Sequence, residues 1–207
     1  EDHPTICITW YGSIMFCNWL TEMQDGNIDN IVYTDIDTTW EDTETVENAY
    51  RTGYRLPSNE EWEYAARFIG TTTPSTGDLA MEYIALDHGG HADLTAGYYW
   101  TPCDYTSGAT SDYHNEAESR AAAWYSGDPL IGGDKLMPVA KKEANHLGLY
   151  DMSGNVLEWC FTPRGSLRVC RGGGWYNSSG FLQVGYWVSD EPFNDFNITG
   201  FRFVRTQ

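Results

Sequence analysis

The amino-acid sequence predicts a single turn-rich domain that combines two amphipathic helices with short strands. Three observations support this prediction. Two capping residues near the N-terminus each precede an apolar stripe of helical period, and strand-like stretches lie at both ends of the last forty residues. The composition also includes 15% aromatic residues and 21 glycines. Large rings then form the core in place of long aliphatic helices, and 207 residues fit one domain better than two.

The first helix is expected after Thr9, whose hydroxyl can cap it. Its buried stripe follows the spacing of three and four residues that places side chains on one helical face. This stripe consists of Trp10, Ile14, Cys17 and Leu20.

The second helix begins with a capping box. Ser58 can accept a hydrogen bond from the amide of Glu61, while the Glu61 side chain reaches back. Its inner stripe is Trp62, Ala65, Ala66 and Ile69. The helix is expected to end at Gly70.

The remainder of the first 150 residues has few regular signals. Residues 23–52 are acidic and polar, which predicts an irregular connection with one short strand at residues 30–33. Clusters of Gly, Asp, Ser and Thr at residues 106–111 and 126–134 predict loops within residues 71–148. The sequence contains no repeat of fixed period, so a single irregular domain spanning residues 1–207 remains the prediction.

Charge and cysteine content limit the partners. The formal net charge of −18 excludes nucleic acid as a partner, because phosphates would be repelled. No apolar run is long enough for a transmembrane helix, and the chain begins at Glu1 with no signal-peptide pattern, so upstream targeting signals are expected to be missing. Five cysteines without metal-ligand spacing leave at least one free thiol.

Residues 168–207, called here the C-terminal segment, have the features of a recognition site. The segment begins with RVCRGGGW (168–175) and ends near GFRFVR (200–205), both strand-like. Between them lie aromatic and small polar residues with no steady period. Such residues supply rigid contact area and adaptable hydrogen bonds. We therefore expect the C-terminal segment to be the working face.

Five motifs in order carry a family resemblance: HPTICITWYGSIMFCNWL (3–20), GYRLPSNEEWEYAAR (53–67), NHLGLYDMSGNVLEWC (145–160) and the two motifs of the C-terminal segment. The chain resembles the formylglycine-generating-enzyme (sulfatase-modifying factor) domain over residues 3–205, with the start of that domain missing. The resemblance implies an α+β domain of the C-type lectin fold, with two main helices, small antiparallel sheets and much irregular structure.

The enzymes of this family do not share all their catalytic residues with this chain. In the oxidases two cysteines bind copper, and soft thiolates are what hold Cu(I). Alignment on the Arg-Gly-Gly motif places Asn177 and Leu182 at those positions, so the chain is predicted not to be an enzyme. The related iron-dependent sulfoxide synthases need histidines. Only His88 and His91 are closely spaced here, which indicates a glycine-rich loop more than a metal site.

The C-terminal segment also resembles that of variable proteins, which diversity-generating retroelements mutate. These proteins carry R-V-x-R-G-G-x-W followed by G-F-R, and here the two variable positions in the first motif are Cys170 and Gly174. Most interior residue types are reachable from an AAC codon by changing adenines, although Trp187 and Gln183 are not. The other candidate contact residues are Tyr176, Asn177, Ser178, Gly180, Phe181, Tyr186, Trp187, Ser189, Asp190, Phe193, Asn194, Asp195, Phe196 and Asn197.

In this interpretation a fixed frame displays variable contacts. The frame residues, expected in paired strands, are Arg171, Trp175, Phe201 and Arg202, with Trp175 and Phe201 packed inward. Aromatic anchors are expected at Tyr176, Phe181, Tyr186, Trp187, Phe193 and Phe196, and polar specificity at Asn177, Asn194, Asp195 and Asn197. Adjacent strand residues point to opposite faces, so at most one of Tyr186 and Trp187 is exposed.

The resemblance implies a candidate calcium site. The ligands would be the carboxylates of Asp151 and Glu158 and the carbonyls of Gly154 and Val156, and hard oxygen donors of this kind suit Ca²⁺. The ion would be structural, and no cofactor is required for function. The alternative is a turn leading into a strand over residues 156–161.

The sequence therefore predicts a non-enzymatic binding protein whose diversified surface lies within about residues 170–199. Its ligand would be a protein or other surface molecule, and its place the bacterial cell surface or the extracellular space, with lipid anchoring through a missing N-terminus. The alternatives are a non-diversified binding or regulatory domain of the same fold, or a family enzyme with altered chemistry.

Overall fold

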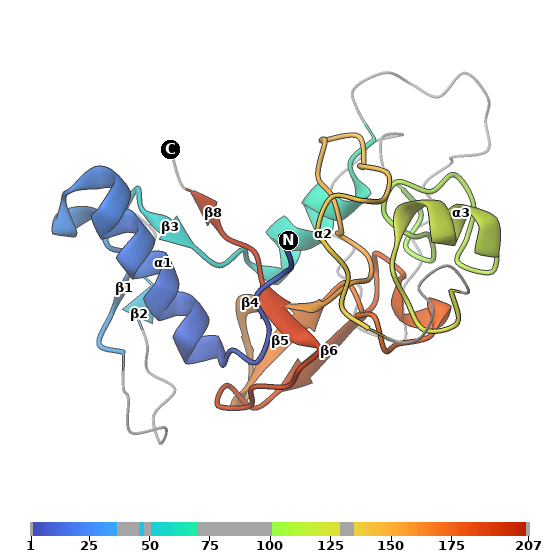
Figure 1. Ribbon diagram of the computed structural model, residues 1–207. Helices are drawn as coiled ribbons and strands as arrows, with labels where there is room; N and C mark the ends of the chain where they lie inside the picture. Colours follow the sequence, from blue (N-terminus) through green and yellow to red (C-terminus); the bar gives the residue numbers. More distant parts are fainter. Residues whose placement is uncertain (1, 37–45, 48–50, 70–100, 129–134, 206–207) are drawn as a thin grey trace.

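A four-stranded sheet at the centre of the computed structural model has one helix on each face (Figure 1). The structure describes residues 2–36, 46–47, 51–69, 101–128 and 135–205. The predicted loop at His88 and His91 and part of the loop at residues 126–134 lie outside them.

The central sheet has the strand order β6-β5-β4-β7. Its strands are β4 (Leu157–Arg164), β5 (Leu167–Arg171), β6 (Trp187–Asp190) and β7 (Thr199–Phe201). Strands β4, β5 and β6 pair antiparallel, whereas β7 runs parallel to β4. Three of the four strands belong to the C-terminal segment, so the segment builds the sheet as well as the surface.

Two small sheets accompany the central one. Strand β1 (Tyr33–Thr34) pairs with β2 (Val46–Glu47), and β3 (Tyr54–Arg55) pairs with β8 (Val204–Arg205). The second pair ties the end of the described chain to the start of the second predicted helix. Small antiparallel sheets and irregular connections are what the family resemblance implied.

Helix α1 (Trp10–Asp25) confirms the first helix prediction. The Thr9 side chain accepts a hydrogen bond from the Gly12 amide, and Gly26 ends the helix in the left-handed conformation. The predicted stripe faces inward, although Leu20 is only half-buried. The opposite face exposes Met15, Trp19 and Met23.

Helix α2 (Asn59–Arg67) confirms the capping box of Ser58 and Glu61. It ends at Arg67 and not at Gly70, so Ile69 lies outside it and the predicted stripe is one residue too long. The reason is a long-range bond: the Thr101 amide donates to the Arg67 carbonyl at 2.7 Å, and Phe68 is extended.

Three other local predictions need correction or extension. The strand expected at residues 30–33 is instead a 3-10 turn, η1 (Ile28–Asn30), followed by β1, because the Asn27 side chain accepts from the Asp29 amide. Helix α3 (Glu116–Ala122), capped by Asn115, was not predicted. Strand β4 begins one residue after the predicted strand at residues 156–161 and runs three residues longer.

Two of the three core clusters lie on opposite faces of the central sheet. Trp159 and Cys170 pack with Trp10 of α1, whereas Cys160 and Val169 pack with Trp62 of α2. Neighbouring residues of a strand point to opposite faces. Helices α1 and α2 therefore cover opposite faces of the sheet, as Figure 1 shows.

Candidate functional site

The backbone of the C-terminal segment is bonded to the rest of the domain at several places by main-chain groups. The Val184 and Gly185 amides donate to the carbonyls of Tyr105 and Cys103 at 2.9 and 2.8 Å. The Trp10 amide donates to the Pro192 carbonyl at 3.0 Å. Because backbone groups make these bonds, the bonds do not depend on which side chains the segment carries at those positions.

Arg171 is the main side-chain anchor of this backbone. Its fully buried guanidinium donates to Asn59 Oδ1 at 2.7 Å and to Glu63 Oε2 at 2.5 Å, both on α2. It also donates to the carbonyls of Val184 and Tyr186 at 3.2 and 3.1 Å. Arg171 therefore joins α2 to the loop before β6.

Six of the sixteen predicted contact residues are exposed. Eight are half-buried, and Cys170 and Gly174 are buried. Cys170 is 2% exposed because its β5 side chain points into the cluster around Trp10, and the backbone of Gly174 is covered, so neither is a surface contact and both predictions are corrected. The exposed residues are Tyr176, Ser178, Phe193, Asp195, Phe196 and Asn197.

Several half-buried candidates have structural contacts of their own. Asn177 Oδ1 accepts from the Gly174 amide at 2.8 Å and shapes the turn after β5. Asp190 Oδ1 accepts from Asn194 Nδ2 at 2.6 Å and from the Glu191 amide. The Phe181 and Tyr186 rings pack edge to face with centroids 4.9 Å apart. Trp187 packs under the Arg164 guanidinium, so neither Tyr186 nor Trp187 is fully exposed.

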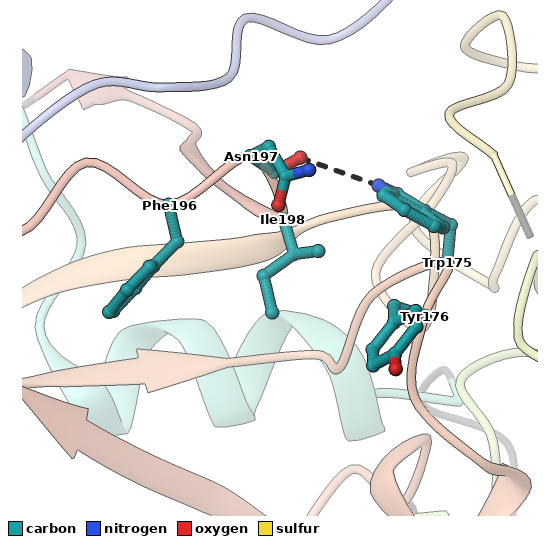
Figure 2. Close-up of a pocket in the computed structure, with 5 residues that line it drawn as sticks. All are labelled: Trp175, Tyr176, Phe196, Asn197 and Ile198. Atoms are coloured by element: carbon teal, nitrogen blue, oxygen red, sulfur yellow. Dashed lines mark hydrogen bonds between the residues drawn. The ribbon is translucent and has the colours of Figure 1, made fainter.

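Five residues of the segment line a surface pocket of about 350 Å³. We call it the aromatic groove, and it is lined by Trp175, Tyr176, Phe196, Asn197 and Ile198. Figure 2 shows that residues 196–198 form one wall and residues 175–176 the other. Trp175 Nε1 donates to the Asn197 carbonyl across the groove at 3.4 Å (Figure 2). Tyr176 is 62% exposed and Phe196 is 48% exposed.

Both walls of the aromatic groove are fixed to the start of β4. The Trp175 amide donates to the Asn155 carbonyl at 2.8 Å, and the Leu157 amide donates to the Ile198 carbonyl at 2.8 Å. Asn155 and Leu157 are only two positions apart in the sequence. A single short stretch of backbone therefore sets the distance between the two walls of the groove.

The frame prediction holds for two residues and is wrong for the others. Arg171 lies in β5 and Phe201 in β7, where Phe201 packs against Phe16 of α1. Trp175 lies in a turn, is half-buried and lines the aromatic groove, while Arg202 follows β7. The prediction that Trp175 packs into the core is therefore wrong, and Ile198 is a further lining residue. Their position beside Tyr176 and Asn197 is the sequence signal that could have included them.

Asn177 and Leu182, the two residues aligned with the oxidase cysteines, both have roles in the fold. The Asn177 side chain closes a turn, and Leu182 is completely buried with Ala123 and Tyr125. All five cysteines are free, and burial raises the pKa of the Cys17 thiol to about 12. Burial also raises the pKa of the Cys160 and Cys170 thiols, so these three stay protonated at neutral pH.

The predicted calcium segment forms the turn before β4. Asp151 and Asn155 have positive φ angles of 54° and 60°. Gly154 lies against Trp124 so closely that a Cβ atom would be 2.3 Å from the Trp124 carbonyl oxygen, so only glycine fits there. This turn also carries the backbone that fixes the aromatic groove.

The two carboxylates of this turn have different partners. Glu158 is buried, and its oxygens accept from Arg202 Nε and Nη2 and from Trp62 Nε1, each at 2.6 Å. Asp151 Oδ2 accepts from the Ala140 amide at 2.8 Å, whereas its Oδ1 is buried without a hydrogen-bond partner. Burial raises the pKa of Asp151. Asp151 therefore fits a cation ligand, while Glu158 is already neutralised by Arg202.

Comparisons with known proteins identify the family. The chain matches the sulfatase-modifying factor enzyme 1-like domain over residues 1–207 and belongs to that family. It is 30% identical over 205 residues to the protein named chaperone protein LppX of Paenibacillus barcinonensis, which covers 90% of this chain and 64% of that protein. The chain thus spans 64% of the length of this relative.

Two solved structures share the fold over nearly the whole chain. Treponema denticola variable protein 1 has a TM-score of 0.67 and 26% identity, covering 98% of this chain and 70% of that one. CarF has a TM-score of 0.65 and 26% identity, covering 99% and 67%. The family match and these structures confirm the predicted C-type lectin fold of the formylglycine-generating-enzyme subtype and the resemblance to variable proteins.

Replacing Arg171 with Ala is expected to destabilise the protein by about 3 kcal/mol, because Glu63 keeps only Arg67 as a cationic partner and two loop carbonyls lose their donor. Urea unfolding followed by tryptophan fluorescence measures this. Glu116→Gln, which removes the exposed pair with Arg120, is the control and should cost at most about 1 kcal/mol. A loss as small as that in Arg171→Ala would mean that the loop is held without it.

The calcium prediction is tested with Asp151→Asn. The raised pKa means that the native state binds the Asp151 proton more tightly than the unfolded state does. Without calcium, the stability of the wild type therefore falls as the pH rises from the pKa of Asp151 in the unfolded chain to its raised pKa in the folded protein. The Asn variant should lack this fall and melt higher than wild type at pH 7 in EDTA.

Calcium should reverse that order. If Asp151 is a ligand, adding calcium raises the melting temperature of the wild type and leaves Asp151→Asn unchanged. An equal response of both proteins, or none in the wild type, would rule out this ligand. Magnesium at the same concentration is the control, because it prefers a stricter octahedral geometry.

Proposed function

We propose that this protein is a non-enzymatic binding protein and that the exposed part of its C-terminal segment is the recognition surface. The observation that supports this proposal is that different groups of the segment hold its backbone and face the solvent. Main-chain groups and Arg171 hold its backbone, while Tyr176, Phe193 and Phe196 point their rings to solvent. Exposed aromatic rings on a held backbone lose little entropy when they bind a partner.

The absence of the oxidase chemistry supports a binding role. Asn177 and Leu182 stand where thiolates would be needed for Cu(I), and neither an amide that closes a turn nor a buried alkyl group can replace them. The alternative enzyme with altered chemistry would need other groups, and copper-dependent oxygen consumption with cysteine peptides tests it directly.

The proposal includes diversification of the surface, supported by the likeness to Treponema denticola variable protein 1. Residues that pack or close turns, such as Leu182, Val184 and Asn177, alternate with exposed ones. Variation would therefore be tolerated where side chains face solvent and not where they face the core. The proposal also includes display at the bacterial cell surface, which protease access in intact cells would test.

Sequencing the locus in several isolates separates diversified from non-diversified binding. Under the proposal, substitutions fall within about residues 170–199 and concentrate at the exposed positions, with a near-copy template and a reverse-transcriptase gene nearby. Leu182 and Val184, which are fully buried, should stay apolar. A segment that is invariant across isolates would leave only the non-diversified binding domain.

A photo-crosslinking amino acid placed at Tyr176 should capture the partner, whereas the same group at Tyr64 should not. Tyr64 is a matched control because it is an exposed tyrosine, 42% accessible, that lies on α2 and is not part of the C-terminal segment. Once the partner is identified, Tyr176→Ala is expected to weaken its binding by about tenfold or more, as a central aromatic contact does.

Tyr64→Ala should leave that binding unchanged. Both variants should keep the wild-type melting temperature, because each ring is exposed. Equal crosslinking at both positions, or unaltered affinity of Tyr176→Ala, would contradict the proposed surface.

A further inference from the structure

The aromatic groove is lined by three aromatic rings, the alkyl side chain of Ile198 and Asn197. Within the wall at residues 175–176, the Trp175 and Tyr176 rings stand at 77° to each other with centroids 5.7 Å apart, so they form a corner. Phe196 and Ile198 line the other side. The indole N–H of Trp175 already donates to the Asn197 carbonyl. What the corner offers a ligand is therefore the negative π-faces of the rings.

The charged side chains of the stretch that contains both groove walls are all acidic. Between Gly172 and Phe201 the sequence contains Asp190, Glu191 and Asp195 but no Lys, Arg or His. Asp195 is exposed and directly precedes Phe196 of the groove. An anionic ligand would find no basic side chain of this stretch to pair with.

The two arginines that flank this stretch are committed elsewhere. Arg171 is completely buried against Glu63, and Arg202 donates to both oxygens of buried Glu158. Neither guanidinium contributes a free positive charge to the groove. With a formal charge of −18 on the whole chain, the long-range field also attracts cations.

From these observations we infer that the aromatic groove receives an organic cation, as presented by a lysine or arginine side chain or by a small alkylammonium compound. The cation would sit against the faces of Trp175 and Tyr176, with Asp195 at the rim. Aromatic corners bind cationic groups through the quadrupole of the rings, and apolar stems of such groups pack on the same surface. The inference rests on the proposed function, because it assigns the ligand chemistry of the same surface.

The test compares two probes that differ only in charge. One is an acetylated, amidated lysine with a trimethylated ammonium group, and the other replaces the ammonium nitrogen with carbon to give a neutral tert-butyl isostere. Binding is followed by NMR of the Trp175 indole N–H and the backbone amides of residues 174–177 and 195–198, at constant ionic strength. The charged probe is expected to bind about fivefold more tightly or better than the isostere.

Three variants locate the effect. Tyr176→Leu keeps an apolar side chain but removes a ring, so it should abolish the preference for the charged probe. Tyr64→Leu, on α2, should leave it intact. Asp195→Asn should weaken the charged probe by about twofold at low salt and leave the isostere unaffected.

Tetramethylammonium and unmodified acetyl-lysine methylamide separate the two ligand sources. Preference for the lysine derivative supports a protein side chain, and equal binding supports a small alkylammonium compound.

Equal binding of the charged probe and its isostere would overturn the inference and describe an apolar groove. Binding that ignores Tyr176→Leu, or no response at the groove signals, would overturn it as well. None of these results decides the proposed function, which stands or falls on crosslinking at residue 176.

Discussion

The buried guanidinium of Arg171 is the interaction on which the arrangement of the C-terminal segment depends. It places a full positive charge where water is excluded, so its stability rests on the surrounding acceptors: Glu63, Asn59 and two loop carbonyls. A charge in such a position fixes distances strictly, because every lost hydrogen bond leaves an unpaired buried group. Helix α2, strand β5 and the loop before β6 are thereby held in one geometry.

A second ion pair, between Glu158 and Arg202, performs the same task at the other end of the segment. It joins the start of β4 to the residue after β7 and receives the indole N–H of Trp62. Burial disfavours the charged form of Arg202, and the attraction of Glu158 outweighs it, so the pKa of Arg202 is raised. One fully buried arginine, Arg171, and one partly buried arginine, Arg202, thus hold the segment, which suits the proposed separation of stability from recognition.

Local patterns predicted most of the regular structure. The capping box of Ser58 and Glu61 and the stripe beginning at Trp10 need only a few neighbouring residues, and both were confirmed. The end of α2 was not predictable from such patterns, because a bond from Thr101, distant in sequence, stops the helix at Arg67.

The sequence predicted which segment forms the candidate site more accurately than it predicted which residues of that segment are exposed. The resemblance located the surface, but whether Cys170 or Trp175 faces solvent depends on which side of a strand or turn packs against α1. Cys170 points into that cluster, while Trp175 turns outward after the strand ends. The orientation of Cys170 is set by contacts with α1, more than a hundred positions away, and that of Trp175 by hydrogen bonds to Asn155 and Asn197, so no local period encodes either.

The common attachment of both groove walls to residues 155 and 157 has a kinetic consequence. Main-chain hydrogen bonds from both walls to one short stretch of backbone oppose independent movement of the walls. Association with a partner would then be governed by diffusion, orientation and the field of the acidic chain, with no conformational gate. Exchanging the exposed side chains would change mainly how long a complex lasts, because dissociation is the step that reports the quality of the contacts.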